Sequence, residues 1–287
     1  MMRFEYVKPA SLDGAAAFLA GHPGTARVLA GGTDLMVQIR AGSRRVGGLE
    51  YVVDIGGLDE LRGIRAEGGE VVVGALTTHA EAAASPLLRA AAPLLACACG
   101  KVGGPQTRNL GTVGGNLCNA SLSADPVTAL VALDAVAHIT GPEGAREVAA
   151  AALLAGNERT NLGAGEILTH LSFRALDPGT PCAFVKLGRR KAMSIARLNV
   201  AVVLEREGEA VKAARIAVGA AFPTTRRVRE AEALLTGAVP TPELFAAAGA
   251  AAGRAMVEAT GVRWSTEYKQ PVLETLVSRA LVQALEG

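Results

Sequence analysis

The chain has 287 residues, of which 50% are hydrophobic and only 3% aromatic, and its formal net charge is +2. This length suffices for one large domain or two moderate ones, and so small a charge gives no support for nucleic-acid binding. Charges or glycines interrupt every apolar run before it reaches the ~20 residues of a membrane-spanning helix. Because residues 1–6 also lack an apolar signal core, we predict a cytoplasmic protein without a membrane span.

The first hundred or so residues alternate between short apolar strands and alanine-rich helical segments. Ser11 is a suitable N-cap for the first helix, because its hydroxyl can accept a hydrogen bond from a free backbone N–H. The predicted strands cover residues 4–7, 27–30, 51–54 and 70–74. The predicted helices cover residues 12–20, 35–40, 78–84 and 87–99.

Two glycine-rich stretches stand out, Ala30-Gly31-Gly32-Thr33-Asp34-Leu35 and the longer one from Lys101 to Asp125. Each glycine costs ~1 kcal/mol inside a helix or strand, so we expect both stretches to be loops. Consecutive free backbone N–H groups in such loops form an anion-binding nest, and the nearby hydroxyl and amide side chains can bind phosphate or ribose. A pair of glycines is also common in plain turns, and the residues alone leave this alternative open.

The amino-acid composition changes at Leu176–Pro181, a segment that contains proline, glycine and aspartate and that we predict to be a linker. A helix is expected from Pro126 to about Ala132. The remaining predicted strands cover residues 135–140, 167–173, 200–206 and 211–218, the last two joined as a hairpin. The remaining predicted helices cover residues 231–235, 242–258 and 269–285.

Several common site motifs are absent. The four cysteines, at 97, 99, 118 and 182, do not have the spacing of a disulfide framework, a zinc site or an iron–sulfur cluster, and the four histidines are dispersed. No metal site is therefore expected. No G-x-G-x-x-G links a strand to a helix, and no Walker A loop, H-E-x-x-H or G-x-S-x-G occurs.

The two glycine-rich stretches, with Arg108-Asn109-Leu110-Gly111-Thr112-Val113-Gly114-Gly115-Asn116 and Ala124-Asp125-Pro126 in the second, resemble the FAD-binding medium subunits of the molybdenum hydroxylases. That family includes xanthine dehydrogenase, carbon monoxide dehydrogenase and nicotinate dehydrogenase, and the resemblance covers nearly the whole chain. It implies an α+β fold: a two-part FAD-binding domain of the vanillyl-alcohol-oxidase-like (PCMH) type, then a small C-terminal domain of a sheet covered by helices. We place these domains at residues 1–176 and 177–287.

The resemblance also implies where the cofactor lies. Residues 28–35 would follow the FAD pyrophosphate, residues 112–116 would cross from the other side, and Asp125 would bind a sugar hydroxyl, although it is equally suited to capping the helix at Pro126. Lys186 would lie near the flavin and Phe184 would cover its ring. The expected cofactor-binding residues are Val28, Leu29, Ala30, Gly31, Gly32, Thr33, Asp34, Leu35, Val102, Thr112, Val113, Gly114, Gly115, Asn116, Asp125, Ile167, Leu168, Phe184 and Lys186.

The function implied is electron transfer within an oxidoreductase. FAD would be bound non-covalently, molybdopterin and 2Fe–2S clusters would belong to a large and a small partner subunit, and the assembly would be a dimer of heterotrimers. The electron acceptor would be external, NAD being one used in the family, and no catalytic acid or base is demanded of this chain. The alternatives are a self-sufficient FAD-dependent oxidase or reductase of the same flavin fold, and a non-catalytic nucleotide-binding module. Thr33 stands in the first loop, where such oxidases often carry a histidine or cysteine that attaches FAD covalently.

Overall fold

The N-terminal part of the chain is a small parallel sheet with the strand order β1-β3-β2. The computed structural model describes residues 3–286, so Met1 and Met2 of the predicted N-terminus and Gly287 of the second predicted domain lie outside the described residues. The strands are β1 (Glu5–Val7), β2 (Ala26–Leu29) and β3 (Tyr51–Asp54). The connections are α1 (Leu12–Gly21), which Ser11 caps as expected, then α2 (Leu35–Arg40) and the 3-10 turn η1 (Arg44–Val46).

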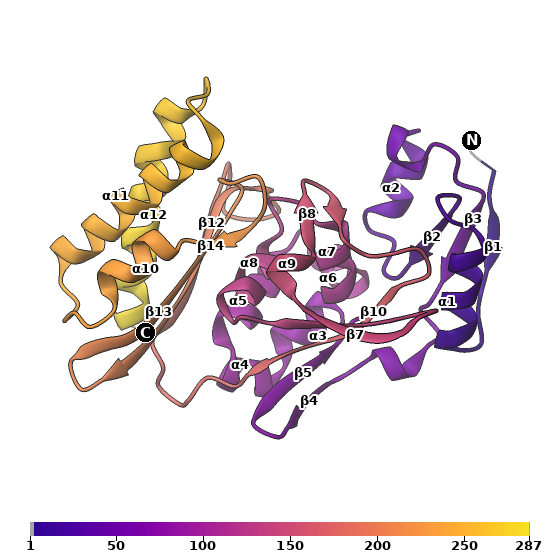
Figure 1. Ribbon diagram of the computed structural model, residues 1–287, viewed down its shortest axis with the longest axis horizontal. Helices are drawn as coiled ribbons and strands as arrows, with labels where there is room; N and C mark the ends of the chain where they lie inside the picture. The colour runs from indigo at the N-terminus through magenta and orange to yellow at the C-terminus, as the bar shows by residue number, and fades with distance from the viewer. Residues whose placement is uncertain (1–2, 287) are drawn as a thin grey trace.

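A five-stranded antiparallel sheet follows, with the order β4-β5-β10-β6-β7 (Figure 1). Its strands are β4 (Ile64–Glu67), β5 (Glu70–Gly74), β6 (Val136–Gly141), β7 (Gly144–Ala149) and β10 (Ile167–Arg174). The sequence predicted the three inner strands but neither edge strand. Most residues of β4 and β7 are exposed, so the edge strands lack the apolar alternation that identifies a half-buried strand. The turn η2 (Asp59–Leu61) precedes β4, and a short hairpin of β8 (Leu154–Gly156) and β9 (Arg159–Thr160) follows β7.

Helices connect these strands, and here two predictions were wrong. The single helix expected over 87–99 is two helices, because Pro93 lacks the N–H that would continue the first and Ala92 before it leaves the helical region. The stretch 101–125, expected to be a loop, contains the helices α6 and α7. The helices are α3 (His79–Ala84), α4 (Pro86–Ala91), α5 (Pro93–Gly100), α6 (Pro105–Leu110), α7 (Val113–Asn119), α8 (Asp125–Ala132) and α9 (Ala150–Leu153).

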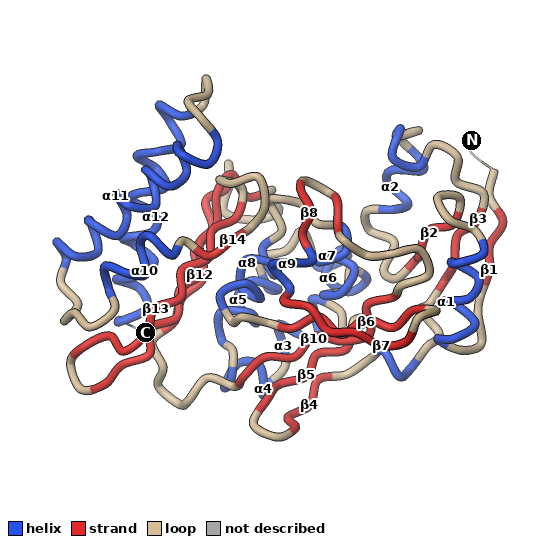
Figure 2. Tube along the Cα trace, viewed as in Figure 1, coloured by secondary structure: helices blue, strands red, loops and turns tan. Residues whose placement is uncertain are grey.

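The C-terminal part is an antiparallel sheet covered by helices (Figure 2). The strands, in spatial order, are β11 (Cys182–Gly188), β12 (Ala196–Glu207), β13 (Ala210–Gly219) and β14 (Arg226–Arg227). The helices are α10 (Arg229–Leu235), α11 (Pro242–Thr260) and α12 (Thr266–Glu286). Their apolar faces bury one side of this sheet, while α5 and α8 pack on the other side. The predicted hairpin, the three helices and the α+β class are confirmed, and residues 175–181 contain no helix or strand.

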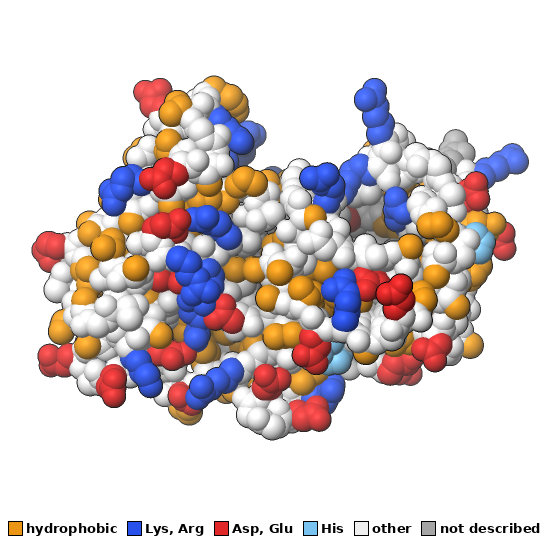
Figure 3. Space-filling view, viewed as in Figure 1, with side chains coloured by type: hydrophobic (Ala, Val, Ile, Leu, Met, Phe, Trp, Pro, Cys, Tyr) orange, Lys and Arg blue, Asp and Glu red, His pale blue; other side chains and the backbone are white. Residues whose placement is uncertain are grey.

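The surface of the molecule carries both signs of charge. On the face drawn in Figure 3, lysine and arginine side chains are interspersed with carboxylates. Within residues 3–286, no helix is both long enough and apolar enough to cross a membrane.

Candidate functional site

A cavity of about 1000 Å³ lies between the N-terminal sheet and the central helices. Both glycine-rich stretches line it, together with residues from β10, β11 and the β8–β9 turn. The residues of the predicted site that line it are Val28, Ala30, Gly31, Gly32, Thr33, Asp34, Leu35, Val102, Thr112, Gly114, Gly115, Asn116, Asp125, Ile167, Leu168 and Lys186. Sequence positions more than 150 residues apart are thus brought to one cavity, as the resemblance implied.

The first glycine loop offers its backbone to the cavity. Within the described chain, the backbone N–H groups of residues 31–34 have no hydrogen-bond acceptor. Gly32 has a φ of +68°, a left-handed conformation that glycine adopts without strain. Four consecutive unbonded N–H groups beside a cavity can hold an anion, so this loop fits the predicted pyrophosphate site.

The second loop does not act in the same way. At residues 113–116 the backbone N–H groups are already used: Val113 donates to Thr77 O at 2.9 Å, Gly114 to Ala75 O at 3.0 Å, and Asn116 to Thr112 O at 2.9 Å. Gly115 donates to the Thr112 hydroxyl at 3.0 Å, which caps α7. The expectation of a second backbone nest is therefore wrong at residues 113–116. Pro105 and the Thr112 cap begin short helices here instead of leaving the chain open.

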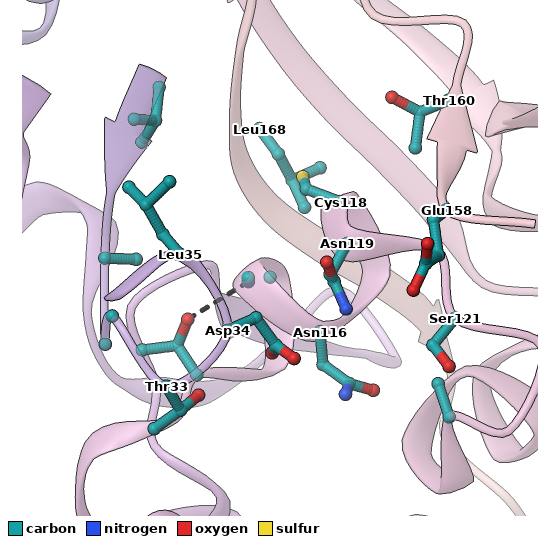
Figure 4. A pocket seen from close by; sticks show the side chains of 18 of the residues that line it. Thr33, Asp34, Leu35, Asn116, Cys118, Asn119, Ser121, Glu158, Thr160 and Leu168 are labelled. Atoms are coloured by element: carbon teal, nitrogen blue, oxygen red, sulfur yellow. Dashed lines mark hydrogen bonds between the residues drawn. The ribbon is translucent and has the colours of Figure 1, made fainter. Parts of the chain in front are cut away.

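What the second stretch offers is side chains and close packing. Figure 4 shows Asn116 and Asn119 of α7 across the cavity from Thr33 and Asp34. Among the described residues, Asn116 Oδ1 and His79 Nδ1 are buried without a hydrogen-bond partner, and both residues line the cavity. Buried polar atoms are usually satisfied, so this pair of atoms indicates a polar ligand.

Glycines set the width of the cavity. A Cβ built on Gly31 would lie 1.9 Å from Leu110 O, and one on Gly114 would lie 2.6 Å from Ala75 Cβ. A side chain at Gly31 would push the two loops apart, and one at Gly114 would push α7 away from Ala75. These positions therefore require glycine for close approach of backbone to backbone.

Asp125 and Lys186 form an ion pair at the wall of the cavity. Lys186 Nζ donates to Asp125 Oδ2 at 2.5 Å and to Lys101 O at 3.0 Å, and Asp125 is only 4% exposed. Burial raises the pKa of Asp125, and hydrogen bonds from Lys186 and Asn199 partly offset that rise. The Asp125 side chain caps no backbone N–H of α8, so the alternative capping role is wrong.

Three predicted residues lie outside the cavity lining. Leu29 packs in the small core beside β3, and Val113 is fully buried. Phe184 is 1% exposed within the main core, where the Lys101 amine lies 5.4 Å from its ring centroid. Side chains alternate across a strand, so Phe184 and Lys186 share one face of β11 by sequence, but only the longer lysine reaches the cavity. The prediction that Phe184 covers the flavin ring is therefore wrong.

Other residues were missed because nothing local marks them. Arg45 reaches across to Glu158, with 2.9 Å between Nη1 and Oε2, and both line the cavity. Asp34 lies near both, and burial, together with the Glu158 charge, raises the pKa of Asp34. Arg45 and Glu158 stand 113 positions apart, and only the fold brings them together.

The thiols of Cys99 and Cys118 near the site contribute to packing and not to chemistry. Burial raises the pKa of Cys118 to about 12 and raises the pKa of Cys99 well above the ordinary thiol range. Neither forms a reactive thiolate near neutral pH. In the described part of the chain, no group of three or more His, Cys, Asp or Glu side chains is arranged to hold a metal.

The residues present fit an FAD dinucleotide. The loop at 31–34 supplies free N–H groups for the pyrophosphate, Asn116 and His79 supply unpartnered polar atoms, and Val102, Ile167 and Leu168 supply apolar wall. A cavity of this volume lies at the upper end of the range of ligand pockets.

Comparison with known proteins supports the same family in both halves of the chain. The sequence profile described as "FAD binding domain in molybdopterin dehydrogenase" matches residues 2–173, and that described as "CO dehydrogenase flavoprotein C-terminal domain" matches residues 183–284. The carbon monoxide dehydrogenase medium chain of Hydrogenophaga pseudoflava is 35% identical over 97% of this chain and 96% of its own length. The nicotine 6-hydroxylase medium subunit of Paenarthrobacter nicotinovorans is 29% identical over 97% of this chain and 96% of its own length.

Solved structures agree with the sequence relatives. The carbon monoxide dehydrogenase from Hydrogenophaga pseudoflava that lacks the Mo-pyranopterin moiety has a chain that superposes with a TM-score of 0.91 at 34% identity, covering 99% of this chain and 98% of that one. A chain of quinoline 2-oxidoreductase from Pseudomonas putida 86 superposes with a TM-score of 0.89 at 28% identity, covering 100% of this chain and 98% of that one.

Proposed function

Because the chain belongs to the family of FAD-binding medium subunits of the molybdenum hydroxylases, we propose that it is the electron-transferring flavoprotein subunit of such an oxidoreductase. It receives electrons from 2Fe–2S clusters of a small subunit and delivers them to an external acceptor such as NAD. A large molybdopterin subunit carries out the hydroxylation. FAD, the expected cofactor of this family, supplies the redox chemistry when bound.

The observation that carries the proposal is the row of unbonded N–H groups at residues 31–34, facing Asn116 across a cavity of dinucleotide size. These groups bind and orient the pyrophosphate. The buried Asp125–Lys186 pair then fixes the position of a positive charge in the wall that β11 contributes. No side chain of the chain is required to transfer a proton to a substrate.

The two domains are proposed to divide at residues 176 and 177. The two family profiles stop and start on either side of that point, and residues 175–181 have no regular structure. We also propose that the protein is cytoplasmic.

The partners are proposed to be a molybdopterin subunit and a 2Fe–2S subunit, assembled as a dimer of heterotrimers. The names of several relatives, such as "medium chain" and "complex subunit alpha", denote parts of larger assemblies. In addition, large apolar side chains are exposed near the cavity mouth and beyond α11: Ile195 is 80% exposed and Trp264 97%. Exposed apolar side chains that gather on one surface favour a protein interface.

The cofactor is tested directly on the purified chain. We expect a yellow protein with about one FAD per chain that denaturation releases into the supernatant, because no covalent attachment is expected at Thr33. Purified protein that is colourless and fails to bind added FAD would contradict the proposal.

Co-expression with molybdopterin and 2Fe–2S subunits separates the proposal from the self-sufficient alternative. We expect the three chains to purify together and substrate hydroxylation to require all of them. Turnover of a substrate by this chain alone, with FAD as its only cofactor, would favour the self-sufficient oxidase.

A further inference from the structure

We propose that Asn199 and Thr128, which lie outside the cavity, are positioning residues that set the charge state of the Asp125–Lys186 pair and thereby the redox potential of the bound cofactor. This inference rests on the proposed function. It assigns a role to a buried polar chain that links the two halves of the molecule.

The chain of hydrogen bonds is continuous. The Thr128 hydroxyl of α8 donates to Asn199 Oδ1 of β12 at 2.8 Å, and Asn199 Nδ2 donates to Asp125 Oδ1 at 2.9 Å. Asp125 Oδ2 accepts from Lys186 Nζ at 2.5 Å. Thr128 and Asn199 are both 0% exposed, so water cannot replace either partner.

The Asp125 carboxylate and the Thr128 hydroxyl together fix which way the Asn199 amide points. A side-chain amide has an acceptor end and a donor end, and the hydroxyl of Thr128 occupies the acceptor end. An ionised carboxylate only accepts hydrogen bonds, so Asp125 requires the NH₂ end. In the reversed orientation, the amide oxygen would face a carboxylate oxygen, two acceptors with no proton between them.

The backbone of β13 lies close to the Thr128–Asn199 hydrogen bond at Gly219. A Cβ built on Gly219 of β13 would lie 2.1 Å from Asn199 Oδ1 and 2.5 Å from Thr128 Oγ1. Any side chain at Gly219 would displace the two residues that orient the amide. The glycine is thus explained by close approach of the strand to the polar chain.

The charged groups around Asp125 define what the amide does. Lys186 of β11 and Lys101, after α5, favour the ionised carboxylate, while burial opposes it. The Cys99 thiol of α5 also lies within electrostatic reach. Burial keeps this thiol protonated. Asn199 is a neutral donor whose hydrogen bond lowers the pKa of Asp125 and so favours the carboxylate. When Asp125 is ionised, its negative charge compensates the positive charge of Lys186. When Asp125 is protonated, the Lys186 charge is uncompensated and acts on whatever occupies the cavity.

A substitution that removes the Thr128 hydroxyl but keeps the shape of the side chain tests the proposed positioning role. In Thr128→Val the buried Asn199 Oδ1 loses its donor, so the hydrogen bond that the amide donates to Asp125 weakens and the pKa of Asp125 rises. More of Asp125 is then protonated at a given pH, so the uncompensated Lys186 charge favours the anionic reduced cofactor and raises its potential. We expect the inflection in a plot of FAD midpoint potential against pH to move upward by about half a unit or more.

Two variants provide controls. Thr128→Ser keeps the hydroxyl and should restore the wild-type inflection. Thr77→Val removes a hydroxyl that is equally buried but donates only to Gly63 O, so it should lower the melting temperature without moving the inflection. The ¹³C resonance of the Asp125 carboxyl in the full-length chain reports the same pKa change even in a variant that loses FAD.

The outcomes separate this inference from the proposed function. Wild-type protein that binds no FAD would overturn the proposed function. Wild-type protein that binds FAD, with the same Asp125 pKa and the same inflection in Thr128→Val, would overturn the positioning role while leaving the FAD site intact.

Discussion

At the scale of single residues, Gly31 is the tightest point of the site. Gly31→Ala places a Cβ 1.9 Å from Leu110 O, so the loop at 31–34 must move away from α6 and its N–H groups lose their position. We expect FAD affinity to fall by tenfold or more, since several hydrogen bonds of ~1 kcal/mol each are misplaced together. Titration of the apoprotein with FAD measures this. Gly21→Ala, where no atom lies within 4 Å, is the matched control, and equal affinities in the two variants would contradict the account.

His79 predicts how stability depends on pH. Burial and the Arg108 charge lower the pKa of His79 to about 4, against an ordinary value near 6.5. Between these values the unfolded chain binds a proton that the folded chain does not, so folded stability falls as the pH decreases from about 6.5 to 4. The contribution amounts to about 3 kcal/mol. We expect His79→Gln to show a shallower loss of stability in denaturant titrations over this pH range, and an unchanged slope would contradict the assignment.

At the scale of elements, Thr112 joins the site to a helix end. Its hydroxyl caps α7, so Thr112→Val should lower stability by about 1 kcal/mol and also reduce FAD binding, because Asn116 lies one turn into that helix. Thr241 caps α11 in the same way, far from the cavity. Thr241→Val should therefore cost similar stability but leave the FAD content unchanged. Melting temperature and bound flavin, measured together, distinguish the two effects.

Element order was predictable from the sequence to the extent that burial imposes a pattern. The hairpin strands β12 and β13 and the three helices of the C-terminal half were found because their apolar positions recur with the period of a buried strand or helix, whereas β11 and the two-residue β14 were not predicted. The exposed strands β4 and β7 carry no such pattern. The helices α6 and α7 were missed because intrinsic propensity argues against glycine-rich helices, whereas Pro105 and the Thr112 cap begin them and tertiary packing retains them.

In the candidate site, too, some residues could be identified from the sequence and others could not. The glycine loops were identifiable because composition alone distinguishes them. The pairs Arg45–Glu158 and Thr128–Asn199 were not, since their members are far apart in the sequence and of common residue types. Asp125 was recognised, but its partners decide whether it caps a helix or pairs with a lysine, and those partners lie on β11 and β12.

At the scale of the whole molecule, one buried cluster spans the two predicted domains. Phe184, Ala201 and Val203 of the C-terminal sheet belong to the same buried cluster as α5 and α8, and every residue of α8 is buried. Removing residues 177–287 would expose that helix and leave Asp125 without Lys186 and Asn199. Exposing a large apolar face is strongly destabilising.

We therefore expect the full-length chain to unfold in a single cooperative transition, and the fragment 1–176 to lack stable tertiary structure despite containing both glycine loops. Calorimetry of the full chain, and near-UV circular dichroism and dye binding of the fragment, measure these properties. Co-expression of residues 1–176 with residues 177–287 is the control: it restores the missing strands without the covalent connection, so FAD binding should return. A fragment 1–176 that alone melts cooperatively and binds FAD would contradict this account, because the FAD site would then be complete without the Lys186 side chain that the second half of the chain supplies.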